Sequence, residues 1–193
     1  MNIVQIGVNV SKDACYAFAK DNKDKIENIY LVEPLPSCIP DIQSTFQDFK
    51  NVNIFNIAIS ADSNVSSAKF YSIKGEPKTA QSSFNIEHLM DHGAKESEIE
   101  SFNVECMTLN DFFEKNSITN CERLYIDTEG HDSLILLGFD YLKYNIKWIE
   151  FETLHTDGAF TQGDNYKKLI DRFEKDGYQI HQHKWNAIAK INS

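Results

Sequence analysis

Two periods of apolar residues alternate along this chain, one typical of β-strands and one typical of α-helices. Short apolar, β-branched runs predict strands at Asn2–Val8, Asn28–Glu33, Val52–Ser60, Glu122–Asp127 and Ile146–Glu152. Apolar residues three or four positions apart predict helices after Thr108 and at Asp13–Lys20, Pro40–Phe49, His131–Tyr144 and Asn165–Asp176. A terminal hairpin is expected at Tyr178–His183 and Ala187–Ile191. This succession predicts an α/β fold with a mostly parallel sheet and helices on both faces.

The middle of the chain departs from this succession. Strands are expected at Ala68–Ile73 and Phe102–Met107, whereas residues 74–101 between them are polar and contain scattered glycine and proline. We expect this segment to form a loop with a short helix. Long connections of this kind are often lids or binding loops. It would then be a lid-like insertion in a single domain over residues 1–193. A surface excursion without a function is the alternative.

Composition narrows the classes of function. The chain has 193 residues, of which 41% are hydrophobic and 25% charged, as is typical of a globular domain. Its net charge of -10 disfavours general binding to nucleic acid and to anionic membrane surfaces. No apolar run could cross a bilayer, and no secretory leader is visible. Four cysteines without a CxxC pair argue against a zinc ribbon and favour reduced thiols, so we expect a cytoplasmic protein.

Ligands of such sheets bind beyond the carboxyl ends of the parallel strands. The first strand ends at Gly7, whose missing side chain allows a tight turn and a close approach to a ligand. The second ends at Glu33, a carboxylate placed to accept the ribose hydroxyls of a nucleoside cofactor. An acid that caps the next helix is the alternative for Glu33. The chain has neither a GxGxxG nor a GxxxxGK(S/T) motif, which disfavours nicotinamide enzymes and P-loop nucleotidases.

Carboxylates and histidines follow the next two strands of the main succession. They are Asp127, Glu129, His131, Asp132, Glu152, His155 and Asp157. Their convergence on one rim would suit a general base or a hard metal ion. Helix N-terminal acids that complement the helix dipole are the alternative, above all for Asp132. The other histidines are expected at the surface or on strand faces, and they are His88, His92, His181 and His183.

One motif in this rim is specific enough to indicate a family. Residues 124–138, LYIDTEGHDSLILLG, resemble the K-I-D-x-E-G-x-E-x-x-x-L-x-G signature of FkbM-type methyltransferases. Shorter elements follow in the family's order, at residues 6–9 (IGVN), 32–34 (VEP), 56–60 (NIAIS), 82–84 (SSF), 108–111 (TLND) and 148–152 (WIEFE). The resemblance covers nearly the whole chain.

The resemblance implies a Rossmann-like class I methyltransferase, with a seven-stranded sheet whose antiparallel strand comes from the terminal hairpin. It implies S-adenosylmethionine as cofactor and methyl transfer to a hydroxyl of a small acceptor such as a sugar or glycan. The implied cofactor-binding residues are Gly7, Asn9, Glu33, Pro34, Ala58, Ser83 and Asp127. His131 is the first choice for a general base and His155 the second. Asp127 or Glu129 would hold the acceptor hydroxyl or accept its proton.

Two alternatives remain open on the same fold. In the first, a divalent metal ion at Asp127, Glu152 and His155 supports methylation of an adjacent diol, although we assign no residue firmly to a metal. In the second, the chain binds the cofactor or a glycan without catalysis. Gln5 and Ser11 favour this second alternative, because many relatives carry an acid and a glycine there.

Overall fold

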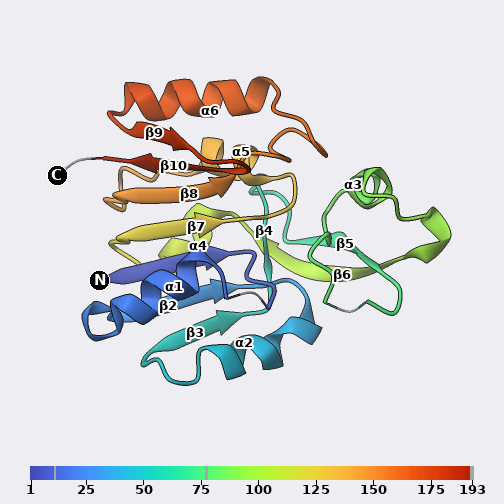
Figure 1. Cartoon of the computed structure of the whole chain (residues 1–193), viewed down its shortest axis with the longest axis horizontal. Coiled ribbons are helices and arrows are strands. Elements are labelled where there is room, and N and C mark those ends of the chain that lie inside the picture. The colour runs from blue at the N-terminus through green and yellow to red at the C-terminus, as the bar shows by residue number, and fades with distance from the viewer. Residues whose placement is uncertain (11, 77, 192–193) are drawn as a thin grey trace.

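The computed structural model describes residues 1–10, 12–76 and 78–191. Its main sheet has seven strands in the order β3-β2-β1-β7-β8-β10-β9 (Figure 1). These strands are β1 Asn2–Ile6, β2 Asn28–Val32, β3 Val52–Phe55, β7 Arg123–Ile126, β8 Trp148–Glu152, β9 Gln179–Gln182 and β10 Asn186–Lys190. β10 lies antiparallel between β8 and β9, whereas β1, β2, β3, β7 and β8 are parallel. The structure confirms the predicted fold class and the antiparallel strand of the terminal hairpin.

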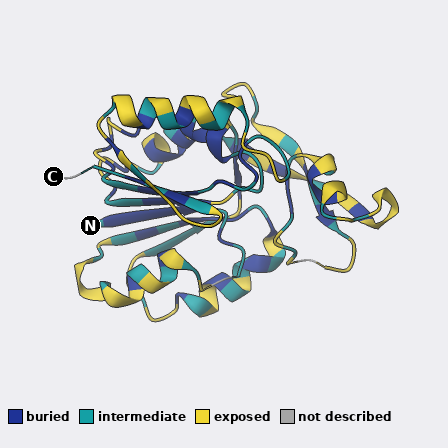
Figure 2. Cartoon of the chain, turned by 45° about the horizontal axis from the view of Figure 1, so that its top comes forward, coloured by how far each residue is buried: buried dark blue, intermediate teal, exposed yellow. Residues whose placement is uncertain are grey.

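Helices pack on both faces of this sheet (Figure 2). The α-helices are α1 Ala14–Asp21, α2 Ile39–Thr45, α3 Ile86–Asp91, α4 Leu109–Lys115, α5 Asp132–Gly138 and α6 Asp164–Lys175. Short 3-10 helices occur at η1 Lys23–Lys25, η2 Pro36–Cys38 and η3 Glu96–Glu98. Side chains of β1 alternate between two buried clusters: Ile3 belongs to the cluster that includes Cys15 of α1, and Val4 to the cluster that includes Phe173 of α6. This alternation explains why apolar residues of β1 occur at both odd and even positions.

The first helix is fixed to β1 by a polar side chain. Asp13 is the N-cap of α1, and its Oδ1 accepts the Tyr16 N–H at 3.1 Å. Its Oδ2 accepts a hydrogen bond from Nε2 of the buried Gln5 at 2.5 Å. Gln5 therefore positions the turn after β1, and Ser11 lies outside the described residues.

The predicted strand at Val52–Ser60 is two strands that belong to different sheets. β3 ends at Phe55, and β4 Ala58–Ile59 pairs with β6 instead of the main sheet. Asn56 lies at the break, where its Nδ2 donates to the carbonyl of Glu33 at 2.8 Å and to that of Pro34 at 3.0 Å. These bonds turn the chain across the end of β2.

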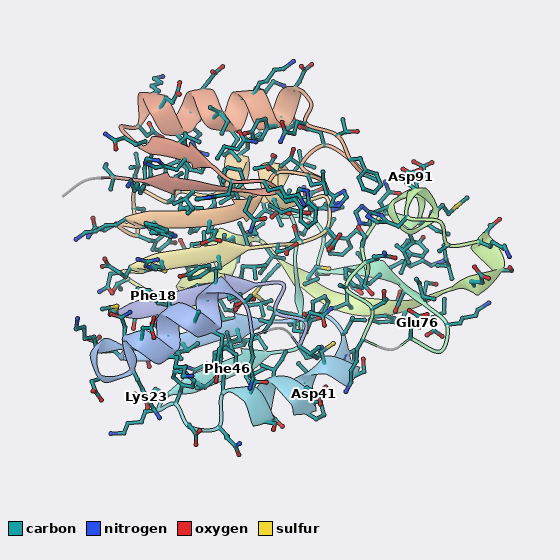
Figure 3. The ribbon with its side chains drawn as sticks, viewed as in Figure 1. Phe18, Lys23, Asp41, Phe46, Glu76 and Asp91 are labelled. Atoms are coloured by element: carbon teal, nitrogen blue, oxygen red, sulfur yellow. The ribbon has the colours of Figure 1, made fainter. Side chains whose placement is uncertain are left out.

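A second, three-stranded sheet stands at the carboxyl ends of the parallel strands, and α3 lies beside it (Figure 1). Its order is β4-β6-β5, with β5 at Ser67–Ile73 and β6 at Ile99–Met107. Figure 3 labels Glu76 and Asp91 within this unit. The prediction of a loop through residue 101 was wrong at its end, because residues 99–101 pair with the last residues of β5.

The predicted helix His131–Tyr144 is shorter than its apolar spacing indicated. α5 ends at Gly138, and Phe139 is extended with ψ 137°. The guanidinium of Arg172, from α6, donates to the carbonyls of Leu136, Leu137 and Phe139 at 3.1, 2.7 and 2.9 Å. These carbonyls of the last turn are satisfied from a neighbouring helix, so the chain is free to turn there.

All four cysteines carry free thiols and are buried, at positions 15, 38, 106 and 121. This burial agrees with the expectation of reduced thiols used as core residues. Among the described residues, none of the helices has both the length and the apolar character that a membrane span requires.

Candidate functional site

A cavity of about 250 Å³ opens where β1, β2 and β7 end. Its walls include apolar side chains such as Ile57 and Phe70. Its lining also includes six of the residues predicted to bind a cofactor, which are Gly7, Asn9, Glu33, Pro34, Ala58 and Asp127. The strand ends therefore bring together positions that lie far apart in the sequence.

A glycine is required at position 7 because the loop after β1 passes directly against the loop after β7. The φ of Gly7 is +76°, and a Cβ built there would lie 1.7 Å from the carbonyl oxygen of Asp127. Gly7 thus approaches the backbone after β7 closely, and it also lines the cavity where we expect a ligand. Any side chain at this position would push the two loops apart at the rim of the cavity.

Glu33 is buried at the end of β2, with a relative exposure of 3%. Its Oε2 accepts the N–H of Asn9 at 2.6 Å, and its Oε1 accepts the N–H of Leu35 at 2.8 Å. Burial raises the pKa of Glu33, whereas the backbone donors counteract that rise. The carboxylate holds the loop after β1 and lines the cavity, and its remaining lone pairs can accept further donors.

Ser82 and Ser83 lie in different places, one in the lining of the cavity and the other at its rim. Ser82 lines the cavity, whereas Ser83, predicted to bind the cofactor, does not. The Ser83 hydroxyl donates to the carbonyl of Glu129 at 2.9 Å, and its backbone bridges to Tyr71. Phe84 follows as part of the cavity wall. Residues 79–84 therefore cover the cavity while being attached to the rim.

Four carboxyl groups gather at the ends of β7 and β8. Asp127 faces the cavity, yet desolvation by the surrounding protein, followed by the charges of Asp132 and Glu129, raises its pKa well above the usual range. Burial, with Asp127 next in effect, raises the pKa of Glu152 to about 10. Asp132 is fully enclosed and accepts the Thr128 hydroxyl at 2.7 Å. Such a cluster of buried carboxyl groups is stabilised by protonation or by a bound cation.

Glu129 lies between two cavities. Its backbone has φ +52°, unusual for a side-chain-bearing residue, and its carboxylate contacts Nε2 of His88 at 2.9 Å. Burial, with the charge of Asp132 next in effect, raises the pKa of Glu129 to about 7. The pKa of His88 is lowered to about 4 by burial, so its contact with Glu129 is a hydrogen bond from a neutral imidazole. Glu129 is thus placed to exchange a proton near neutral pH.

The second cavity, of about 380 Å³, adjoins the first through Glu129. Its lining includes His88, Gly130, His131 and Thr156. Nδ1 of His131 is buried and has no hydrogen-bond partner among the described residues. Burial lowers the pKa of His131, so its ring is a neutral group that can donate to or accept from a ligand.

The structure places the predicted catalytic residues in different surroundings. Asp127 and Glu129 line the first cavity, and His131 lines the second without reaching the first. His155 is buried and lines neither of these two cavities, and its Nδ1 accepts the N–H of Phe160 at 3.0 Å. Of the two histidines proposed as base, only His131 lines one of the two cavities.

Sequence reasoning missed His88 and His92, which we expected at the surface or on a strand face. His88 is 2% exposed, and its ring lies 4.5 Å from that of His92 and 4.9 Å from that of His155, measured between centroids. The only signal in the sequence was their spacing of four residues, which places both on one face of a helix turn. The metal alternative also changes, because Glu129 and not Asp127 groups with Glu152 and His155 within 4.8 Å.

Comparison with known proteins identifies the family. A family model described as the methyltransferase FkbM domain matches residues 5–180. Among curated proteins, none matches this chain. The methyltransferase FkbM from Methylobacillus flagellatus KT aligns over 98% of this chain and 43% of its own, with 11% identity and a TM-score of 0.58. The chain thus spans less than half of that protein, and at this identity the likeness shows the fold.

Two fibrillarins align less closely. The Methanococcus jannaschii fibrillarin pre-rRNA processing protein aligns over 98% of this chain and 66% of its own, with 13% identity and a TM-score of 0.49. The Aeropyrum pernix fibrillarin, solved with S-adenosylmethionine, aligns over 97% and 64%, with 11% identity and a TM-score of 0.45. The match to the family model covers most of the chain, from β1 to β9. This chain belongs to the FkbM methyltransferase family.

Proposed function

We propose that this chain transfers a methyl group from S-adenosylmethionine to a hydroxyl of a small acceptor such as a sugar or glycan, with Glu129 as the general base. The observation that carries the proposal is that Glu129 lines both cavities. One cavity has the strand-end residues expected for a nucleoside cofactor, and the other is lined by polar groups. A group shared by both is where donor and acceptor would meet.

The first cavity suits the cofactor. The Glu33 carboxylate can accept the ribose hydroxyls, and the apolar walls near Ile57 and Ala58 can contact the adenine. The carboxyl groups of Asp127 and Glu129 would stabilise a positive sulfonium nearby. When bound, the cofactor supplies an activated methyl group whose leaving group needs no acid.

The chain's own residues then align the acceptor and take its proton. Glu129 accepts the hydroxyl proton as the oxygen–methyl bond forms and the methyl–sulfur bond breaks, and the proton later leaves to solvent. His88 holds one oxygen of Glu129, which leaves the other available. The unpartnered Nδ1 of His131 would hold the acceptor hydroxyl, a positioning role in place of the base that we first expected.

Glu33→Ala should weaken binding of S-adenosylhomocysteine at least tenfold. It removes a charged acceptor of ribose hydroxyls, worth about 2–3 kcal/mol, and releases Asn9 and Leu35. Calorimetric titration measures the loss, and circular dichroism checks that the fold persists. Asp24→Ala, an exposed acid in η1, is the control and should bind like the parent chain. Unchanged affinity in Glu33→Ala would remove the ribose assignment.

Amide exchange at residues 79–84 should slow when S-adenosylhomocysteine is added. These residues cover the first cavity, with Thr79, Ala80 and Ser82 in its lining. A ligand beneath them would reduce their local opening. Mass-spectrometric hydrogen exchange compares them with the terminal hairpin, which should not respond. Equal protection with and without ligand would show that this segment does not respond to the cofactor and is not a lid.

The proposed activity is tested with labelled S-adenosylmethionine and a panel of sugars, glycans and other hydroxylated acceptors. The expected product carries the label on oxygen, as mass spectrometry of the isolated product would show. Label on nitrogen or sulfur would contradict the O-methyl assignment. Tight cofactor binding without transfer to any acceptor would favour the binding module. We place the reaction in a reducing compartment with a small-molecule acceptor, consistent with four free thiols and a net charge of -10.

A further inference from the structure

Three imidazole rings converge beside the rim, outside the cofactor cavity. His88 and His92 come from α3 and the residue after it, and His155 follows β8. The ring centroids of His92 and His155 are 4.8 Å apart, and one ligand atom from each of the three residues lies within 4.8 Å of the others. Segments distant in the sequence thus present three of the commonest nitrogen ligands to one point.

Two of these rings are held as metal-binding histidines are held. Nδ1 of His92 donates to the carbonyl oxygen of His88 at 2.7 Å, which leaves the lone pair of its Nε2 free. Nε2 of His88 donates to Oε2 of Glu129 at 2.9 Å. Ligating histidines commonly donate their second N–H to a carbonyl or a carboxylate in this way.

The cluster also contains polar atoms without a partner. Nδ1 of His88 is buried, in a residue that is 2% exposed, and accepts no hydrogen bond from the described residues. Oε2 of Glu152 is likewise buried and unpartnered there, and its Oε1 lies 3.5 Å from Nε2 of His155. Buried lone pairs without donors are costly, and a cation would satisfy them.

We propose that His88, His92 and His155 bind one divalent transition-metal ion of the zinc class, with Glu152 as a further ligand. Imidazole and carboxylate together suit zinc and its neighbours better than Mg²⁺, which prefers oxygen ligands alone. In a tetrahedral zinc site the ligand atoms are about 3.3 Å apart, so these side chains would have to draw closer. His155 would also move its proton to Nδ1, which releases the N–H of the exposed Phe160 to solvent.

The ion would join α3 to the end of β8 and so fix the segment that covers the cofactor cavity. Zn²⁺ should therefore slow amide exchange in α3 Ile86–Asp91 and raise the melting temperature. This inference concerns binding alone and does not depend on the methyl-transfer proposal.

Equilibrium dialysis of the full chain against Zn²⁺, with metal analysis, tests the site directly. The parent chain should bind one Zn²⁺ per chain, and an excess of Mg²⁺ should not compete. His92→Ala should weaken Zn²⁺ binding more than tenfold, because loss of an outer partner alone costs about 10–100-fold. This half-buried position leaves the fold intact more readily than the buried His88.

The matched control removes the two imidazoles of the terminal hairpin. His181 and His183 are exposed, and the double variant His181→Ala/His183→Ala should keep the full affinity for Zn²⁺ and the full thermal shift. The proposal is overturned if the parent chain shows no saturable binding of one equivalent. It is also overturned if His92→Ala binds as the parent does, or if the double variant alone loses the metal.

Discussion

Glu129→Gln is expected to lower turnover about 100-fold or more while S-adenosylhomocysteine binds within about twofold of the parent chain. The amide keeps an acceptor for His88 but cannot take a proton from the acceptor hydroxyl. Steady-state kinetics with the acceptor found by the labelling screen, together with calorimetry, measures both effects. Glu87→Gln, an exposed acid on α3, is the matched control and should leave both unchanged. A variant with normal turnover would exclude Glu129 as the base.

The same residue should determine the pH profile. Because the pKa of Glu129 is raised to about 7, kcat/KM for the cofactor should rise as pH increases through that value, and Glu129→Gln should lack this rise. The contribution of Glu129 to the stability of the fold changes with pH in the opposite direction. The fold favours the protonated carboxyl, so its stabilisation is complete below the ordinary pKa of glutamate and is lost as pH rises through 7. Glu129→Gln should therefore melt higher than the parent at pH 8.

Gly7→Ala is expected to abolish cofactor binding and to lower the melting temperature severely. The added Cβ would lie 1.7 Å from the Asp127 carbonyl oxygen, so the loops after β1 and β7 must separate. The separation would distort the rim that carries Glu129 and break the contact of Asn9 with Glu33. Thermal unfolding and calorimetry with S-adenosylhomocysteine measure the two losses.

Gly75→Ala supplies a matched control for this substitution. Gly75 has the same φ of +76°, yet apart from its chain neighbours no atom of the described residues lies within 4 Å of a Cβ built there. The control therefore carries only the backbone penalty, about 1–2 kcal/mol, and should bind the cofactor normally. If Gly7→Ala behaves like Gly75→Ala in both measurements, the crossing of the loops does not control the site.

The positions of the main strands along the chain could be predicted because their apolar runs have one dominant cause, burial in a parallel sheet. Where the prediction failed, a distant side chain decides the local structure. Asn56 divides the third predicted strand because its side chain donates a hydrogen bond to the end of β2. Arg172, from α6, ends α5 by donating to the carbonyls of its last turn. Neither contact leaves a periodic pattern in the sequence.

The residues of the candidate site also fall into those that could be predicted and those that could not. Gly7, Glu33 and Asp127 stand at strand ends, so topology alone brings them to one cavity. The contact of His88 with Glu129 depends on how the segment between β5 and β6 folds back over the rim, which no spacing encodes. The pKa values that favour Glu129 over His131 as a base likewise arise from burial by segments distant in the sequence.

A crystal structure of the chain with S-adenosylhomocysteine and an acceptor would show directly whether Glu129 lies between the two ligands. We expect ribose hydroxyls at Glu33, the sulfur directed toward Glu129, and the acceptor hydroxyl in the second cavity within hydrogen-bond reach of that carboxylate. A cofactor bound elsewhere, or a sulfur directed away from Glu129 with the acceptor on another face, would contradict this arrangement.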